Sequence, residues 1–305
     1  MIRGIHHTAL STEDLERSSK EAAMKIGVFE FAIDQSVDPA VLAKRAEELG
    51  FDSFWVPEHA IIPIHYTTRY PLSEDGVIPD AYGRIVDPFV ALARASAVTK
   101  TIKLGTGICL VPERNPLMLA KEVATLDHFS KGRFIFGIGA GWLKEESEIL
   151  GGDFPHRWTQ TRDAILAMKE LWTKDEAGYH GRYYDFPAVR SFPKPAQKPH
   201  PPIFLGGIDK NVFKRVVEWG DGWMPGTSLE GLQHGRATLN ELAEKAGRDP
   251  RSIEVLAFGR PGKFRDREEI EALEKAGVDH VTIWLTSDGS GAIAEVEELA
   301  RQLLP

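Results

Sequence analysis

The sequence is poor in the residues that build covalent and metal-based scaffolds. Cys109 is the single cysteine among 305 residues, so neither an intramolecular disulfide nor a cysteine metal cage can form. Histidines occur at neither HxH nor HxxxH spacing, which disfavours a metal-dependent barrel hydrolase, and we predict no metal site. One unpaired thiol fits a reducing compartment, so we expect a cytoplasmic protein.

Long apolar runs and an excess of positive charge are also missing. No apolar run reaches the ~18–20 residues of a membrane span, and residues 1–23 lack the apolar stretch of a signal peptide. Because 37 Lys and Arg stand against 45 Asp and Glu, a broad basic face for nucleic acid is disfavoured. We therefore expect neither a membrane nor a nucleic acid as partner, but a small-molecule substrate.

The residues that are present alternate between strand and helix patterns. With 42% hydrophobic and 27% charged residues, the composition is that of a globular protein. The segment 24–31 is a short apolar run typical of a buried strand. Asp38-Pro39 then predicts a helix start, and Gly50 predicts its end. Further strands are expected at 54–56, 103–111, 133–138, 203–205, 222–224, 253–258 and 281–285. Further helices are expected near 88–99, 116–130, 157–174, 210–219, 229–246, 267–276 and 292–304.

About eight strand–helix units without a break in composition predict one α/β domain over residues 24–305. We expect a closed (β/α)8 TIM barrel, and a doubly wound sheet is the alternative. Two insertions interrupt the pattern. Residues 60–86 follow the second strand, and residues 178–201, after the fourth, are rich in proline and aromatic residues and predict a hairpin or a lid.

Residues 1–23 fall outside this pattern. The stretch IRGIHHTALSTEDLERS resembles the opening strand and helix of the vicinal-oxygen-chelate family, the glyoxalase-like metalloenzymes. There, the position of His7 would be a metal ligand. Because the rest of that module is missing, we interpret the segment as a tail, a fusion remnant or an upstream start, and assign it no chemistry.

Catalytic groups of such barrels lie at the carboxyl ends of the strands. Glu58 and His59 follow the second predicted strand. A carboxylate beside an imidazole can hold a polar ring, or the two can serve as a base and its orienting partner. The alternative is that both residues cap the long loop that follows.

Glycines loosen the ends of two predicted strands. Gly105 and Gly107 lie in the third strand, and the fourth ends in GIGAGW at 137–142. Glycine inside a strand marks the close approach of another backbone or of a ligand, and tight helix–sheet packing is the alternative. A Rossmann fingerprint follows the first strand of its domain, so this position in the fourth unit disfavours a nicotinamide fold.

Two further glycines, Gly206 and Gly207, precede a predicted helix. Amides at a helix N-terminus attract phosphate. In phosphate-binding barrels such sites follow the last strands of the chain. The negative charge of Asp209, next to these glycines, argues against direct contact with a phosphate. Trp142 and Trp223 are typical of core or lid residues, and Trp223 is also a candidate for closing the apolar side of a flat pocket. Together these strand ends predict a site for a large planar phosphorylated ligand.

The motifs also carry a resemblance. The ordered set KIGVF, GFDSFWVPEH, IKLGTGICLVPERNPLMLAKEVATLDHFSKGRFIFGIGAGW, PPIFLGG and EWGDGWMP resembles the luciferase-like monooxygenase family over about residues 24–304. The resemblance implies a (β/α)8 barrel, a homodimer, and FMN or the deazaflavin coenzyme F420 bound at the strand ends. The deazaflavin-dependent branch is the more similar one.

The resemblance also implies roles for single residues. Glu58 and His59 would lie near the reactive ring as catalytic residues, and the Gly107–Ile108 peptide would be the bulged, often cis, peptide behind it. Trp142 stands where the sugar-phosphate dehydrogenases of the family carry an acidic residue, which disfavours a glucose-6-phosphate reaction. The implied cofactor-binding positions are Gly107, Ile108, Gly139, Ala140, Gly141, Gly206 and Gly207.

Three functions follow as hypotheses. The first is an oxidoreductase that moves a hydride between F420 and a small organic substrate, with His59 handling the substrate proton and the substrate entering beneath 60–86. The second is an FMN-dependent monooxygenase supplied by a separate reductase. The third is a non-catalytic flavin-binding protein.

Overall fold

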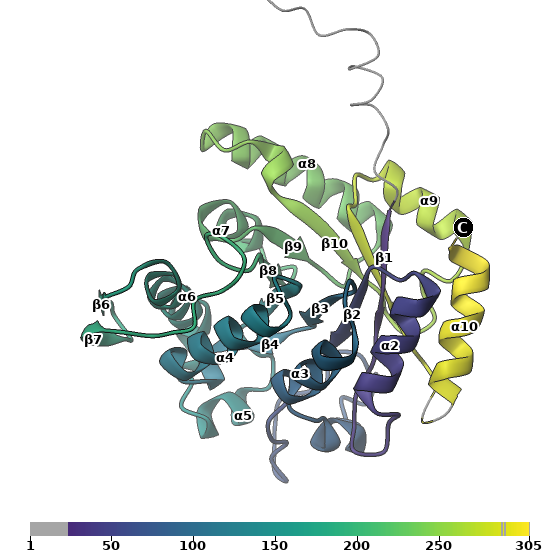
Figure 1. The fold of residues 1–305 in the computed structure, drawn as a ribbon, viewed down its shortest axis with the longest axis horizontal. Coiled ribbons are helices and arrows are strands. Elements are labelled where there is room, and N and C mark those ends of the chain that lie inside the picture. The colour runs from purple at the N-terminus through teal and green to yellow at the C-terminus, as the bar shows by residue number, and fades with distance from the viewer. Residues whose placement is uncertain (1–23, 288, 290, 305) are drawn as a thin grey trace, which may run out of the picture.

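The strands of the computed structural model, which describes residues 24–287, 289 and 291–304, form a closed parallel barrel (Figure 1). Its strands are β1 (Lys25–Phe29), β2 (Ser53–Val56), β3 (Lys103–Thr106), β5 (Phe134–Gly139), β8 (Ile203–Gly206), β9 (Gly222–Met224), β10 (Glu254–Phe258) and β11 (His280–Trp284). Because β1 pairs with both β2 and β11, and β3 also pairs with β5, the ring has no open edge. The predicted (β/α)8 barrel is therefore confirmed, and the doubly wound sheet is ruled out.

Helices between the strands surround the barrel. They are α2 (Pro39–Leu49), α3 (Pro88–Val98), α4 (Pro116–Phe129), α6 (Arg157–Thr173), α7 (Val212–Trp219), α8 (Leu229–Lys245), α9 (Arg267–Lys275) and α10 (Gly291–Leu303). The first three begin with proline after a side-chain cap, from Asp38, Asp87 and Asn115. Gly50 ends α2 at a φ of 97°, a left-handed conformation that glycine adopts without steric penalty.

The third predicted strand, 103–111, is interrupted in its middle. The peptide between Gly107 and Ile108 is cis, as the resemblance implies. After it, the chain continues as the two-residue strand β4 (Cys109–Leu110), which pairs with β5. The interruption therefore lies at the carboxyl end of β3, on the rim of the barrel.

Large side chains close the inside of the barrel. The interior cluster consists of Phe29, Trp55, Ile135, Phe204, Met224 and Leu256. A Cβ at Gly105 would lie 2.1 Å from the Trp55 ring, and one at Gly137 would lie 2.0 Å from the carbonyl oxygen of Thr106. These two glycines are needed for close packing among the strands and inside the barrel, and not for the helix–sheet packing that the sequence offered as the alternative.

The two insertions differ in structure. Residues 60–86 have no strand or α-helix and contain a short 3-10 turn, Asp80–Arg84. Residues 178–201 overlap an antiparallel hairpin, β6 (Ala177–His180) and β7 (Asp185–Val189), at the edge of the molecule beside α6 (Figure 1). A helix that the sequence did not predict, α5 (Lys144–Ile149), follows β5; it has six residues and no side-chain cap, so neither periodicity nor a start signal marks it. Residues 1–23, interpreted above as a tail, a fusion remnant or an upstream start, lie outside the described residues.

Candidate active site

A cleft of about 440 Å³ opens at the carboxyl ends of the barrel strands. Its floor is apolar and includes Phe29, Phe258 and Trp284, the last residues of β1, β10 and β11. All nine residues that the sequence nominated line this one cleft: Glu58, His59, Gly107, Ile108, Gly139, Ala140, Gly141, Gly206 and Gly207. Strand ends that are far apart in the sequence therefore meet as the barrel geometry predicts.

His59 has a hydrogen-bond partner on each ring nitrogen. Nδ1 lies 2.5 Å from the Oε2 atom of Glu146, and Nε2 lies 3.1 Å from the indole nitrogen of Trp142. An ionised carboxylate only accepts hydrogen bonds and an indole N–H only donates them. These partners assign the ring as neutral, with its hydrogen on Nδ1 and an acceptor at Nε2.

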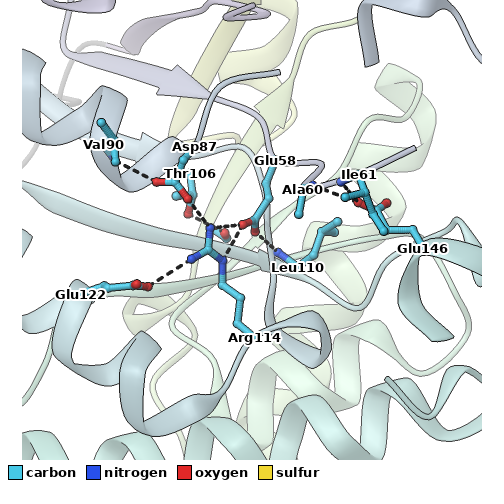
Figure 2. A network of polar contacts seen from close by, with 11 residues as sticks. Glu58, Ala60, Ile61, Asp87, Val90, Thr106, Leu110, Arg114, Glu122 and Glu146 are labelled. Atoms are coloured by element: carbon cyan, nitrogen blue, oxygen red, sulfur yellow. Dashed lines mark hydrogen bonds and ion pairs between the residues drawn. The ribbon is translucent and has the colours of Figure 1, made fainter. Parts of the chain in front are cut away.

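Glu146 lies on α5 with a fully buried side chain. Its second oxygen, Oε1, accepts hydrogen bonds from the backbone N–H groups of Ala60 at 3.0 Å and Ile61 at 3.2 Å, contacts that Figure 2 shows. The carboxylate therefore fixes both the imidazole and the start of the 60–86 insertion. Sequence reasoning missed this residue, which stands 87 positions after His59; the one signal was a glutamate pair directly after the glycine-rich strand end.

Glu58 has different partners. It accepts a hydrogen bond from the N–H of Leu110 at 2.6 Å and from Nε of Arg114 at 2.5 Å. Arg114 also contacts Asp87 at 2.7 Å and Glu122 at 3.1 Å (Figure 2). The interpretation of Glu58 as the orienting partner of the neighbouring histidine is therefore wrong. Glu58 anchors the rim around β4 instead.

Glu113 is a further buried carboxyl group, close to Glu58 and Glu146. Burial, together with the nearby charges of Glu146 and Glu58, raises its pKa to about 9. Among the described residues, its buried Oε1 atom has no hydrogen-bond partner, and a Cβ at Gly141 would lie 2.7 Å from it. A side chain at Gly141 would therefore displace this carboxyl group, and the φ of 80° also favours glycine there, which the sequence pattern did not reveal.

The 60–86 insertion packs aromatic side chains over His59. The ring centroid of Tyr82 lies 5.3 Å from that of His59, and the hydroxyl groups of Tyr70 and Tyr82 lie 2.7 Å apart. Burial raises the pKa of Tyr82 well above its usual range. Glu145, beside Glu146, holds the insertion by accepting hydrogen bonds from the N–H groups of residues 67 and 68 at 2.6 and 3.2 Å. The insertion therefore shields one side of the imidazole from water.

The opposite end of the cleft is cationic. Arg157, at the start of α6, lines the cleft near Gly207, and burial lowers the pKa of its guanidinium. Within the part of the chain that the structure describes, its buried Nε atom has no hydrogen-bond partner. Asp209, whose charge opposed phosphate binding in the sequence, is neutralised by Arg215 at 2.7 Å. An anion at this end would therefore meet the positive charge of Arg157, whose Nη1 donates a hydrogen bond to the carbonyl oxygen of Phe154 at 3.0 Å.

The two tryptophans have different surroundings. Trp142 lines the cleft and bonds His59, as described. Trp223 is buried, donates a hydrogen bond to the carbonyl oxygen of Gly207 at 2.9 Å and packs on Phe213. It is a core residue, so the expectation that it closes a flat pocket is wrong.

The described residues lack two kinds of feature, a metal cluster and a membrane-spanning helix. Residues 24–287, 289 and 291–304 contain no group of three or more His, Cys, Asp or Glu side chains placed to hold a metal ion. In the same part of the chain, no helix combines the length and the apolar character needed to cross a membrane.

Comparison with known sequences gives a family match. The model of a family described as luciferase-like monooxygenase matches residues 28–302. A protein of Mycobacterium tuberculosis is 36% identical over 286 residues, which cover 92% of this chain and 99% of the relative. This similarity extends over the barrel and all of the cleft described above.

Other relatives carry names that mention cofactors. An F420-dependent glucose-6-phosphate dehydrogenase of Amycolatopsis mediterranei is 29% identical over 85% of this chain and 74% of its own length. An FMNH2-dependent dimethylsulfone monooxygenase of Pseudomonas putida is 29% identical over 70% of this chain and 54% of its own length. The F420-dependent tetrahydromethanopterin reductase of Methanopyrus kandleri has a similar fold, with a TM-score of 0.75 at 19% identity over 93% of this chain and 99% of that one.

Proposed function

The chain belongs to the luciferase-like monooxygenase family, whose members include F420- and FMN-dependent oxidoreductases, and on this premise we propose that it transfers a hydride between F420 and a small organic substrate. The observation that carries the proposal is the imidazole of His59. Its proton-accepting nitrogen lines an apolar cleft, while a buried carboxylate holds the other nitrogen. A base held in one orientation beside a dry surface is what proton transfer during a hydride transfer needs.

The residues of the cleft fit a flat phosphorylated cofactor. One wall has glycine at the ends of β3, β5 and β8, and a Cβ at Gly139 would already lie 1.9 Å from Cδ1 of Ile108. The glycines of this wall therefore make room for the side chain of Ile108, which lines the cleft, and a ring would lie against Ile108. Arg157, whose side chain lines the cleft, would hold the phosphate end by a charge-assisted hydrogen bond.

The bound deazaflavin would supply a two-electron hydride acceptor that does not react with oxygen. His59 would take the proton of a substrate hydroxyl at Nε2 as the carbon atom of the same group gives up its hydride, so that an alcohol becomes a carbonyl compound. Tyr82 and Trp142 would exclude water from the imidazole. Trp142 also supports a substrate other than a sugar phosphate, because the sugar-phosphate branch carries an acid at this position.

An FMN-dependent monooxygenase is the second candidate, and the FMNH2-dependent relative supports it. The guanidinium of Arg157 suits the terminal phosphate of FMN as well as the phosphodiester of F420. The two candidates differ in their oxidant. We expect reduction of F420 by members of a panel of small alcohols, and no oxygen consumption with reduced FMN beyond that of reduced FMN without the protein. Oxygen consumption without any F420 reduction would contradict the proposal, and tight binding without either reaction would favour a non-catalytic flavin-binding protein.

A second copy of the chain is the protein partner that we propose. Between α3 and α4, away from the cleft, the surface is hollowed, and exposed apolar side chains of Val90, Met118 and Phe129 lie on these helices. Exposed apolar side chains gathered on one surface are typical of protein interfaces. Sedimentation of the full chain would test the homodimer, and a monomer at micromolar concentration would contradict it.

A further inference from the structure

The buried carboxylate of Glu146 accepts hydrogen bonds from three donors, one on a side chain and two on the backbone. Oε2 faces Nδ1 of His59, and Oε1 faces the N–H groups of Ala60 and Ile61. We propose that Glu146 is the positioning residue of the site: it fixes the hydrogen of His59 on Nδ1 and keeps Nε2 an acceptor. The inference rests on the role of His59 in the proposed function.

Only an ionised carboxylate satisfies this geometry. Three donors converge on Glu146, and a carboxylate offers acceptor positions on both oxygens. A glutamine has one acceptor oxygen and an NH2 group that donates. If its oxygen stayed with Ala60 and Ile61, the NH2 group would face Nδ1 of His59 and would force the hydrogen of the imidazole onto Nε2.

Trp142 contacts the other ring nitrogen of His59. Its indole N–H donates to Nε2 of His59 at 3.1 Å, and both residues line the cleft. A ligand that takes the place of the indole must bring a donor of its own, because the nitrogen beneath it has no hydrogen. The substrate class is therefore a hydroxyl compound, and a carbonyl compound would leave its acceptor oxygen facing another acceptor.

The neighbouring Glu145 offers a matched control. It lies on the same turn of α5 and accepts hydrogen bonds from residues 67 and 68 of the insertion. The hydrogen bonds of the His59 ring go to Glu146 and Trp142 and not to Glu145. Loss of Glu145 would thus disturb the insertion and α5 without changing the donors around the imidazole.

Nitrogen NMR of the full-length protein without cofactor tests the inference directly. The protein is labelled with 15N-histidine, and the signals of His59 are assigned by their loss in His59→Gln. The spectra are compared at a pH above which these signals no longer change. We expect the wild type to carry hydrogen on Nδ1, Glu146→Gln to shift most molecules to hydrogen on Nε2, and Glu145→Gln to match the wild type. An unchanged tautomer in Glu146→Gln, or an equal shift in Glu145→Gln, would overturn the inference.

Two further variants decide the matter if Glu146→Gln does not fold. Glu146→Asp keeps the carboxylate, and Trp142→Phe removes the donor at Nε2 while keeping an aromatic ring. We expect hydrogen on Nδ1 in both, and hydrogen on Nε2 in Trp142→Phe would show that the indole sets the tautomer instead.

Turnover provides the functional readout. Loss of an orienting carboxylate lowers kcat by about 10²- to 10⁴-fold in comparable sites, so we expect such a fall in Glu146→Gln, partial rescue in Glu146→Asp, and cofactor Kd values within about threefold of the wild type. Equal kcat in Glu146→Gln and the wild type would overturn the positioning role. A wild type that binds no cofactor would instead contradict the proposed function, while leaving the tautomer result as it stands.

Discussion

Two walls of the cleft differ in what fills them. The polar wall presents His59, from the segment after β2, which the buried Glu146 of α5 holds from behind, and their nitrogen and oxygen atoms are tied by hydrogen bonds. The glycine wall consists of Gly107, Gly139 and Gly206, at or just after the ends of β3, β5 and β8, and the side chain of Ile108 packs against Gly139 and Gly206. The first wall fixes a proton, and the second offers an apolar surface against which a ring would lie. Chemistry and binding should therefore be separable by mutation.

The largest expected effect comes from removing the base of the polar wall. His59→Ala should lower turnover by about 10²- to 10⁴-fold, the usual contribution of a general base, and should leave cofactor affinity within a few fold. Steady-state kinetics and a fluorescence titration measure the two quantities. His180→Ala is the control, because this histidine is exposed on the β6–β7 hairpin. Unchanged turnover in His59→Ala would remove its proposed role.

The next effect concerns the cationic end of the cleft. Arg157→Gln should weaken the binding of F420 or FMN by about 10- to 100-fold, because a charge-assisted hydrogen bond contributes about 1.5–3 kcal/mol. Riboflavin, and a deazaflavin without its phosphate tail, should bind both proteins equally. Arg190→Gln, on the exposed hairpin, is the matched control. Equal losses for ligands with and without phosphate would contradict the assignment.

The glycine wall can be filled at one position. In Gly139→Ala the new Cβ would lie 1.9 Å from Cδ1 of Ile108, so Ile108 must move toward the cleft that it lines. Overpacking of this kind costs about 1–3 kcal/mol, and we expect cofactor affinity to fall about tenfold. Gly83→Ala, whose Cβ would meet no atom closer than 3.9 Å, should bind as the wild type does. Wild-type affinity in Gly139→Ala would show that the ring lies elsewhere.

The smallest effect is on stability. The pKa of Glu113 is about 9 in the folded protein, above its ordinary value of 4.5. The folded chain therefore holds this proton more tightly than the unfolded chain, and the free energy of unfolding falls as the pH rises from about 4.5 to 9. Glu113→Gln should remove the contribution of this group to the pH dependence. The free energy of unfolding of the variant should equal that of the wild type near pH 4 and exceed it by about 1–3 kcal/mol near pH 9. Urea unfolding at the two pH values measures the difference, and equal stability at pH 9 would contradict the burial of a neutral carboxyl group.

The sequence predicted the glycine wall better than the polar wall. Proline starts, side-chain caps and apolar runs are local signals, and they were sufficient for the barrel and for the strand ends that carry Gly107, Gly139 and Gly206. The contacts of His59 are not local. Glu146 lies on a six-residue helix without a cap, and no periodicity marks so short a segment.

Two errors have the same physical origin. Glu58 was paired with His59 because the two are neighbours in the chain, but the two side chains contact different groups. Glu58 instead meets Arg114, 56 positions away. Arg157 also went unnoticed, because its relation to Gly207 exists only after the barrel closes.

Side-by-side titration of the cofactor-free protein with F420 and FMN tests the central claim most directly. A deazaflavin-dependent enzyme should bind F420 at least tenfold more tightly than FMN, and the bound deazaflavin should then be reduced by a hydroxyl substrate. A preference for FMN would contradict the hydride-transfer function, and binding of neither cofactor would contradict the assignment of the glycine wall as well.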